Sequence, residues 1–283
     1  MNIPILYEDT NILVLNKPAG IAVHTDGKGR GEETVVDFIL AYYPKLKNVG
    51  EPYEVEVAGG EKVLIPRPGI VHRLDKETSG ALIVAKNQKT FEMLKEEFKE
   101  HKIQKVYRAF VYGPVKDPVA SLKTGMRGVI DSPIGRSPTD ARMWTAGRGA
   151  REPLREARTE YIVLKRFSDE EDNIENEIIA NGKSSGKAAT DKSSVDRQSH
   201  MFSYVEAYPR TGRTHQLRVH FRFINHPIVS DPIYRGSKEP ALGMKRLALH
   251  AYKITFTLSN GEKVTIEASL PKDFESVIKK YIK

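Results

Sequence analysis

The chain has 283 residues, of which 39% are hydrophobic and 29% are charged, enough for one large domain or two small ones. It contains no cysteine, which excludes disulfides, thiolate nucleophiles and metal centres with cysteine ligands. A net charge of +8, from 45 Lys and Arg against 37 Asp and Glu, is equally compatible with a solvated basic surface and with a polyanionic partner such as nucleic acid. Because no long apolar run and no secretory signal pattern are present, we expect a cytoplasmic protein with no membrane contact.

The amino-terminal part of the sequence predicts short strands, polar loops and one helix. Aliphatic and β-branched runs at 3–6 and 12–15 flank a stretch of turn-forming residues, which is typical of two neighbouring strands. After a glycine-rich loop, residues 34–43 have the pattern of a short helix. A second loop, rich in Gly, Glu and Pro, is expected at 48–68.

The next stretch predicts a helix between two strands. Residues 81–85 are apolar throughout, which indicates a buried strand. Residues 90–101 carry apolar side chains at helical spacing, with Thr90 as the expected N-cap. The chain is then expected to return to a strand at 106–112.

Residues 168–200 differ in composition from the rest of the chain. They combine an acidic block with Gly, Ser, Lys and Asp and hold no aromatic residue. Such a segment buries too little apolar surface to offset its ordering entropy, so we expect a mobile insertion between strands at 159–164 and 202–207. Residues 182–188 superficially resemble a phosphate-binding loop, but the glycine spacing, the hydroxyl residue and the preceding strand are missing, so we reject a nucleotide site there.

The carboxy-terminal part predicts one helix and a group of closing strands. Residues 213–223 have an apolar stripe at helical spacing. Strands are expected at 246–252, 253–258 and 263–268, and Asn260 with the following glycine forms a hairpin-turn signal between the last two.

The densest cluster of reactive side chains lies at 69–80, in a polar connection directly before the buried strand. A rigid scaffold can present side chains from such a connection to a ligand. Asp75 taken alone is more typical of a surface ion pair to Arg73 or Lys76, and His72 is compatible with a hydrogen-bonded loop histidine.

The second cluster, residues 210–220, combines arginines with Gly, Thr and His at the start of an expected helix. Guanidinium groups and free backbone N–H groups at a helix start suit phosphate contact, which makes Arg213 and His215 candidate substrate-binding residues. The alternative hypothesis for this cluster is a metal site formed by His215, His220 and His226. The spacing of five between the first two histidines is wrong for one helical face and no carboxylate accompanies them, so we expect no metal.

The string at 72–80, His-Arg-Leu-Asp-Lys-Glu-Thr-Ser-Gly, resembles the signature of the RluA-type pseudouridine synthases. Five further motifs of that family follow the family order and extend the resemblance over residues 6–274. They lie at 16–20, 105–109, 212–220, 226–231 and 246–251.

The resemblance implies an α+β fold with a bent, largely antiparallel central sheet, flanking helices and the active site in a central cleft. It implies one catalytic domain over residues 1–283, without the separate N-terminal S4-type RNA-binding domain of many family members. We expect a monomer. The reaction breaks the C1′–N1 bond of uridine and rejoins the base through C5, without redox change or phosphoryl transfer, so no cofactor is expected.

By the same resemblance, Asp75 is the essential carboxylate, acting as nucleophile or base. Arg218 is its expected bidentate partner, because a carboxylate buried against a flipped base needs a counter-charge. Leu217 is expected to form an apolar floor under the uracil. Tyr107 is expected to stack on the other face and assist proton transfer, although on residue type alone it is an ordinary strand aromatic.

Arg73 lies two residues before Asp75, so in an extended segment both side chains point the same way. This placement suits a guanidinium that fills the space left by a flipped nucleotide. The resemblance to the family implies a stem-loop of ribosomal or transfer RNA as the substrate. Two alternatives are a catalytically inactive RNA-binding or chaperone relative and, more distantly, a phosphate-ester hydrolase; release of tritium from 5-tritiated uridine separates both from the synthase.

Overall fold

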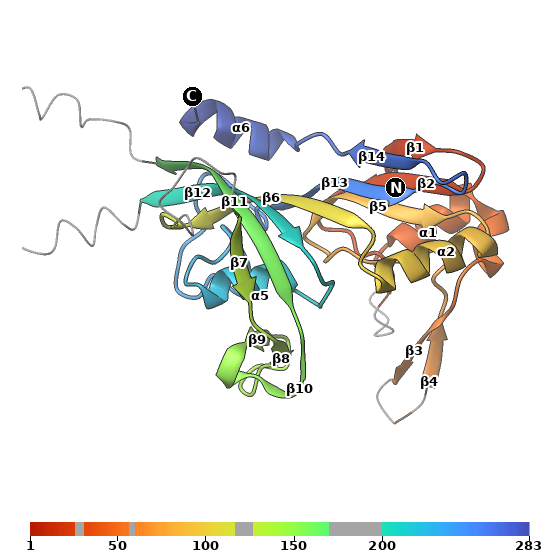
Figure 1. The fold of residues 1–283 in the computed structure, drawn as a ribbon, viewed down its shortest axis with the longest axis horizontal. Helices are drawn as coiled ribbons and strands as arrows, with labels where there is room; N and C mark the ends of the chain where they lie inside the picture. Colours follow the sequence, from red (N-terminus) through yellow and green to blue (C-terminus); the bar gives the residue numbers. More distant parts are fainter. Residues whose placement is uncertain (26–30, 57–59, 61, 117–126, 170–199, 283) are drawn as a thin grey trace, which may run out of the picture.

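A mixed sheet runs through the part of the chain that the computed structural model describes, which is residues 1–25, 31–56, 60, 62–116, 127–169 and 200–282. Nine strands form this sheet within the described residues (Figure 1). In order across the sheet they are β1 (Ile5–Glu8), β2 (Ile12–Lys17), β5 (Ser79–Ala85), β13 (Leu249–Thr257), β6 (Gln104–Tyr112), β12 (Met201–Pro209), β11 (Arg158–Ser168) and β7 (Gly128–Asp131), with β14 (Lys263–Glu267) paired to β13. All neighbours are antiparallel except β5 and β13, so the expected α+β fold with a largely antiparallel sheet is confirmed.

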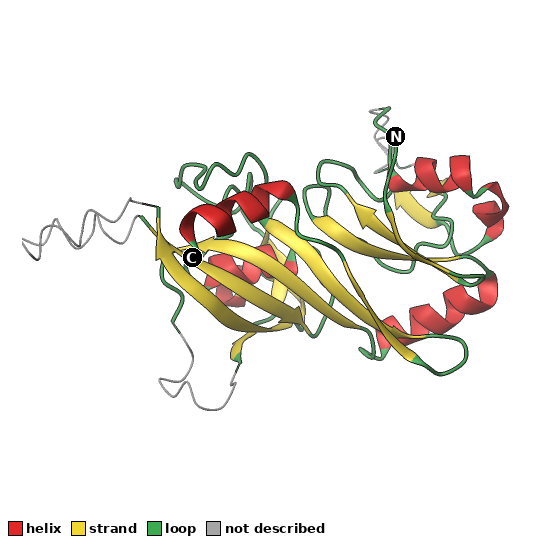
Figure 2. Cartoon of the chain, turned by 90° about the horizontal axis from the view of Figure 1, so that it is seen from above, coloured by secondary structure: helices red, strands yellow, loops and turns green. Residues whose placement is uncertain are grey.

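Helices flank both faces of the sheet. They are α1 (Val35–Tyr42), α2 (Gln88–Lys99), α5 (Gln216–Phe223) and α6 (Lys272–Tyr281). Figure 1 shows α6 on the opposite side of the sheet from α5, and Figure 2 shows α6 over one end of the sheet, with α1 and α2 at the other end. Among the helices of the described residues, none combines the length and hydrophobicity needed to cross a bilayer.

The helix starts depend on side-chain caps, and one expected cap is wrong. Thr34 caps α1 in a reciprocal capping box with Asp37, in which each side chain accepts from the other residue's backbone N–H. The helix expected from Thr90 begins earlier, because Asn87 is the N-cap and accepts from the backbone N–H of Thr90 at 2.9 Å.

Several elements were not expected from the sequence. The loop expected at 48–68 contains the hairpin of β3 (Tyr53–Glu56) and β4 (Lys62–Ile65). A three-stranded sheet, in the order β10 (Arg151–Arg155), β8 (Ile134–Arg136) and β9 (Trp144–Ala146), lies among residues for which no strand was expected. The α6 helix was also missed, and the two strands expected at 246–252 and 253–258 are the single strand β13.

A close crossing of β5 and β13 places the loop at 72–78 over the middle of the sheet. The two strands pair in parallel only at Ser79–His250 and Gly80–Ala251. Gly80 has φ +118°, and a Cβ there would lie 2.2 Å from the carbonyl oxygen of Ala251, so this crossing requires glycine. The serine hydroxyl also bonds to Nδ1 of His250 at 2.8 Å, which fixes the end of the loop.

The insertion expected at 168–200 falls almost wholly on residues 170–199, which lie outside the described residues. Its two flanks are well defined. Strands β11 and β12 remain paired up to Ser168 and Met201, and the N–H of Asp169 donates to the carbonyl of His200 at 3.2 Å. The two ends are therefore already held at hairpin distance.

We predict that replacing residues 170–199 with a short Gly/Ser linker leaves the fold intact, because the β11–β12 ladder brings the ends together and closure entropy varies weakly with loop length. The free energy of unfolding, measured in urea, should change by less than about 1 kcal/mol. A loss above about 3 kcal/mol would show that these residues contribute to the folded core.

Candidate active site

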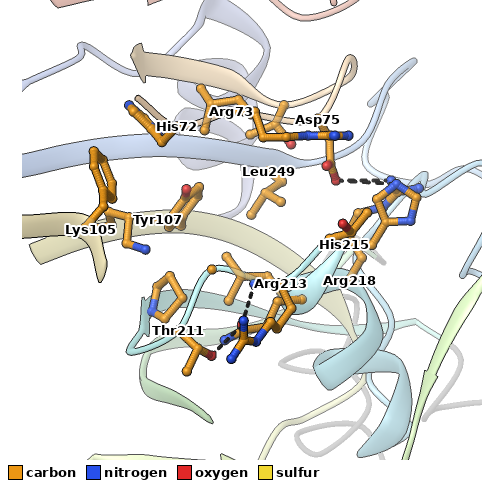
Figure 3. A pocket seen from close by; sticks show the side chains of 18 of the residues that line it. His72, Arg73, Asp75, Lys105, Tyr107, Thr211, Arg213, His215, Arg218 and Leu249 are labelled. Carbon is orange, nitrogen blue, oxygen red and sulfur yellow. Dashed lines mark hydrogen bonds and ion pairs between the residues drawn. The ribbon is translucent and has the colours of Figure 1, made fainter. Parts of the chain in front are cut away.

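A cavity of about 550 Å³ lies beneath the loop at 72–78 and brings together both sequence clusters (Figure 3). Its walls come from that loop, from β6 and from the segment leading into α5. All seven residues expected to act at the site line it, namely Arg73, Asp75, Tyr107, Arg213, His215, Leu217 and Arg218.

The loop that carries Asp75 is held in place by buried anchors. Leu74 is 5% exposed and packs in the core, and it lines the cavity together with Arg73 and Asp75 on either side of it. Lys17 is fully buried and donates to three carbonyls, including that of Lys76 in this loop at 3.0 Å. Burial lowers the pKa of Lys17 to about 7.

Arg218 joins two carboxylates from different parts of the chain. Its Nε and Nη2 atoms donate to the two oxygens of Asp231 at 2.7 and 2.8 Å, and its Nη1 atom donates to Oδ2 of Asp75 at 3.2 Å. The expectation of a bidentate pair between Arg218 and Asp75 is therefore wrong, because the fork of the guanidinium is occupied by Asp231. Burial lowers the pKa of Arg218, but the hydrogen bonds and charge of Asp231 and the charge of Asp75 outweigh it and raise this pKa overall.

The two oxygens of Asp75 differ in their surroundings. Oδ2 receives the Arg218 hydrogen bond and lies 4.0 Å from Nε2 of His215. Within the described part of the chain, Oδ1 has no hydrogen-bond partner. Because the Asp75 side chain is 18% exposed and lines the cavity, this carboxylate is accessible to a substrate while its direction is fixed from one side.

The segment before α5 is organised by Gln216. Its amide oxygen accepts from the Thr211 hydroxyl at 2.6 Å and from the Arg213 backbone N–H at 3.0 Å, and its amide nitrogen donates to the carbonyl of Arg158 at 3.0 Å. The helix expected from residue 213 begins at 216, because His215 adopts a left-handed φ of 55°. Arg213 donates from Nε to the carbonyl of Glu156 at 2.9 Å, so this side chain joins the cavity wall to the residues that follow β10.

Apolar and aromatic groups form the remaining walls. Leu217 and Leu249 are both buried at the cavity surface, and Tyr107 reaches it from β6. Burial and the nearby charge of Asp75 raise the pKa of Tyr107, so its phenol is protonated at neutral pH.

One cation and one histidine also line the cavity. Burial lowers the pKa of Lys105 to about 8, and its ammonium lies over the Phe98 ring at 5.9 Å. His72 stacks on the same ring and accepts from the backbone N–H of Ile83 at 2.9 Å. Burial, aided by Lys105, lowers the pKa of His72 to about 3, so it is neutral.

The histidines considered as metal ligands point to separate partners. His220 bonds to Thr159 and Ser132, and His226 bonds to the carbonyl of Tyr112. In the residues that the structure describes, no three His, Asp or Glu side chains are grouped as a metal site.

The sequence reasoning missed two residues of the site. Asp231 was noted only as part of a motif, yet it is fully buried and holds Arg218. Tyr234 was not considered, although its ring lies 4.9 Å from the Arg218 guanidinium and its hydroxyl bonds to His215 at 2.9 Å. The only hint in the sequence was that Asp231 and Tyr234 lie three residues apart, a spacing typical of a turn. That spacing alone does not indicate a functional site.

Comparison with known proteins identifies the family. The family model for RNA pseudouridylate synthase matches residues 11–223. An uncharacterised RNA pseudouridine synthase of Synechocystis sp. is 32% identical over 98% of this chain and 69% of its own length. Two proteins named ribosomal large subunit pseudouridine synthase D are each 33% identical: that of Borreliella burgdorferi over 100% of this chain and 70% of its own length, and that of Neisseria meningitidis over 96% and 59%.

Two solved structures share the fold of this chain. Human RNA pseudouridylate synthase domain containing 1 superposes with a TM-score of 0.63 at 24% identity, over 95% of this chain and 84% of that one. Human RNA pseudouridylate synthase domain containing 4 gives a TM-score of 0.61 at 25% identity, over 97% and 91%. The chain therefore belongs to the RNA pseudouridylate synthase family, whose members are isomerases that convert uridine in RNA to pseudouridine.

We predict that the two carboxylates on Arg218 differ sharply in their effect on stability. Asp231→Asn should lower the free energy of unfolding by about 3 kcal/mol, because it leaves a buried guanidinium without its main counter-charge. Asp75→Asn should cost less than about 1 kcal/mol, because the Asp231 pair persists and Asp75 is partly solvated. Urea unfolding of both variants measures this difference, and equal losses would contradict the assignment of Asp231 as the anchor.

Proposed function

We propose that this protein isomerises uridine in large-subunit ribosomal RNA and that Asp75 is the essential carboxylate. The observation that supports this role is that, within the described residues, only one oxygen of Asp75 is hydrogen-bonded. Arg218 donates to Oδ2, which leaves Oδ1 for the nucleoside. A carboxylate is ionised at neutral pH, so it is ready to act as a nucleophile or a base.

The reaction is an internal transfer in which the composition of the base does not change. The C1′–N1 bond breaks, a C1′–C5 bond forms, the proton on C5 leaves to solvent and N1 gains a proton. Attack of a carboxylate on C1′ and removal of the 2′ proton by a carboxylate both require one free oxygen beside the sugar. Asp75 Oδ1 supplies that oxygen in either route.

The uracil would lie between an apolar surface and an aromatic ring. Leu217 provides the apolar surface, with Leu249 beside it in the cavity wall. Tyr107 provides the ring, and its protonated phenol is a hydrogen-bond donor to the turning base.

Two projections on one side of the sheet offer a surface for the RNA backbone. Figure 1 shows the β3–β4 hairpin and the β8–β9–β10 sheet extending to the same side. Residues 127–158, which include the small sheet, contain seven arginines and no lysine, and six of the arginines are exposed. Arg67, two residues after β4, and Arg213, bonded to Glu156, join these projections to the cavity walls. Arginine suits bidentate contact with phosphate.

The choice of ribosomal RNA rests on the names of relatives. Two relatives at 33% identity are named for the large ribosomal subunit. A ribosomal substrate implies action in the cytoplasm, and the net charge of +8 suits a polyanion of this kind.

The direct experiment uses RNA labelled with tritium at C5 of uridine. We predict that the protein releases tritium from unmodified large-subunit ribosomal RNA and that Asp75→Ala stops the release without weakening RNA binding, since it removes a negative charge facing a polyanion. Transfer RNA labelled in the same way is the comparison substrate. Release from transfer RNA alone would overturn the ribosomal proposal, and residual turnover in Asp75→Ala near the wild-type rate would overturn the role of Asp75.

We predict that Arg73 remodels folded RNA. Arg73 lines both the active-site cavity and a neighbouring cavity beside β3, which is where a guanidinium can replace a flipped nucleotide. Arg73→Ala should weaken binding of a stem-loop by about 1–3 kcal/mol and should weaken binding of a short unstructured RNA less.

The control for this prediction is Lys279→Ala. It removes an exposed cation from α6, which lies on the side of the sheet opposite α5. It should leave both affinities nearly unchanged. Equal losses on the two RNAs in Arg73→Ala would reduce Arg73 to a simple phosphate contact.

We predict that RNA affinity depends on the charge of Lys105. With a pKa of about 8, Lys105 is a cation below that pH and loses its charge above it. RNA phosphates favour the charged form of Lys105, so above about pH 8 RNA binding requires that Lys105 take up a proton. The dissociation constant for RNA should therefore rise about fourfold from about pH 7 to about pH 8.5. Lys105→Arg, which stays charged, should abolish this rise, and an equal rise in both proteins would assign the effect to another group.

A further inference from the structure

Two hydrogen bonds and a 4.0 Å contact link the small β8–β9–β10 sheet to the catalytic carboxylate. The backbone N–H of Trp144, the first residue of β9, donates to the hydroxyl of Tyr234 at 2.9 Å. The same hydroxyl lies 2.9 Å from Nδ1 of His215. The other ring nitrogen of His215, Nε2, lies 4.0 Å from Oδ2 of Asp75.

The direction of the bond between Tyr234 and His215 follows from counting protons. A phenol oxygen carries one proton, and here the oxygen already accepts one from Trp144. Tyr234 is 1% exposed, and in the described part of the chain no other acceptor lies within hydrogen-bond distance of its hydroxyl. Burial raises the pKa of Tyr234 to about 12, so the proton is retained at neutral pH. The phenol therefore donates to Nδ1.

This bond decides the protonation pattern of His215. Burial lowers the pKa of the imidazole, and the cations Arg218 and Arg73 act in the same direction against the opposing charges of Asp75 and Asp231. The ring is then neutral at neutral pH, and a neutral imidazole that accepts at Nδ1 carries its proton on Nε2.

We propose that Tyr234 is a positioning residue that fixes His215 as a donor aimed at Oδ2 of Asp75. This proposal rests on the proposed function, in which Asp75 is the reacting group. Together with Nη1 of Arg218, the Nε2–H of His215 occupies the Oδ2 side, so the reacting oxygen is Oδ1. We expect the separation of 4.0 Å to shorten in the complex with RNA, as catalytic hydrogen bonds commonly do. His215 acts as a donor to the carboxylate and not as the base of the reaction.

The protonation pattern can be measured without any turnover. Protein labelled with nitrogen-15 in its histidines should show His215 protonated at Nε2 and unprotonated at Nδ1 in long-range proton–nitrogen spectra at neutral pH. His72 provides the opposite reference in the same spectrum: it is neutral, and its Nε2 accepts from Ile83, so its proton lies on Nδ1. Finding His215 protonated at Nδ1 would overturn the proposal, whether or not the protein modifies RNA.

The kinetic consequence is tested with Tyr234→Phe, which removes the hydroxyl while keeping a ring beneath Arg218. We expect the single-turnover rate to fall about tenfold, the RNA dissociation constant to stay within about twofold and the Nδ1-protonated form of His215 to appear. Tyr161→Phe, which removes the hydroxyl of a buried tyrosine of β11 outside the cavity, should leave the rate unchanged. A wild-type rate in Tyr234→Phe would overturn the positioning role.

Two substitutions of His215 keep the proposal testable if Tyr234→Phe fails to fold. The amide nitrogen of Gln reaches about the position of Nε2, and that of Asn about the position of Nδ1. His215→Gln should therefore retain at least about tenfold more activity than His215→Asn, because only the first restores a donor beside Asp75. The reverse order would contradict the proposal. Absence of tritium release in the wild-type protein would instead refute the proposed function and leave the spectra as the test of the proton position.

Discussion

One buried guanidinium determines the arrangement of the site. Arg218 is 4% exposed, and its charge is acceptable there because Asp231, fully buried, accepts two hydrogen bonds from it. That pair already satisfies the guanidinium fork, which leaves Nη1 as a fixed donor at the cavity wall. Asp75 meets this donor from another part of the chain, so the direction of its carboxylate is set by a pair that does not include it.

The arrangement of strands and helices brings Asp75 and Arg218 together. Asp75 belongs to the loop that precedes β5, and the crossing of β5 with β13 at Gly80 places that loop over the centre of the sheet. Arg218 lies in the first turn of α5, whose start is fixed by Gln216 and by the left-handed turn at His215. The site is therefore held between two short, heavily hydrogen-bonded segments on the same side of one sheet.

Much of the fold was predictable because hydrophobic patterning is local. The strands around 81–85, 106–112 and 202–207 were expected from apolar runs, and each extends one or more residues beyond the run because neighbouring strands supply pairing. The β3–β4 hairpin was missed because its side chains are polar or exposed, including Tyr53 and Leu64. Pairing of this kind depends on partners that a local pattern does not reveal.

For the candidate site, the sequence predicted the main residues but not the buried partners that hold them. The seven residues expected to act at the site come from the motifs, and all of them line the cavity. Their partners were not expected, because the Arg218–Asp231 pair and the Tyr234–His215 bond are contacts between segments whose relative position only the fold determines. The assignment of a bidentate pair to Asp75 failed for this reason: the sequence offers several carboxylates, and burial decides which one takes the guanidinium fork.

The central claim, that Arg218 must join two carboxylates at once, is tested most directly by the single-turnover rate of Arg218→Lys on tritiated ribosomal RNA. An ammonium keeps the charge but lacks the planar fork, so it can satisfy Asp231 or orient Asp75, and not both. We predict a folded protein that binds RNA with nearly unchanged affinity and isomerises it at least about a hundredfold more slowly, equivalent to about 2.7 kcal/mol. A rate within about threefold of the wild-type protein would contradict the account.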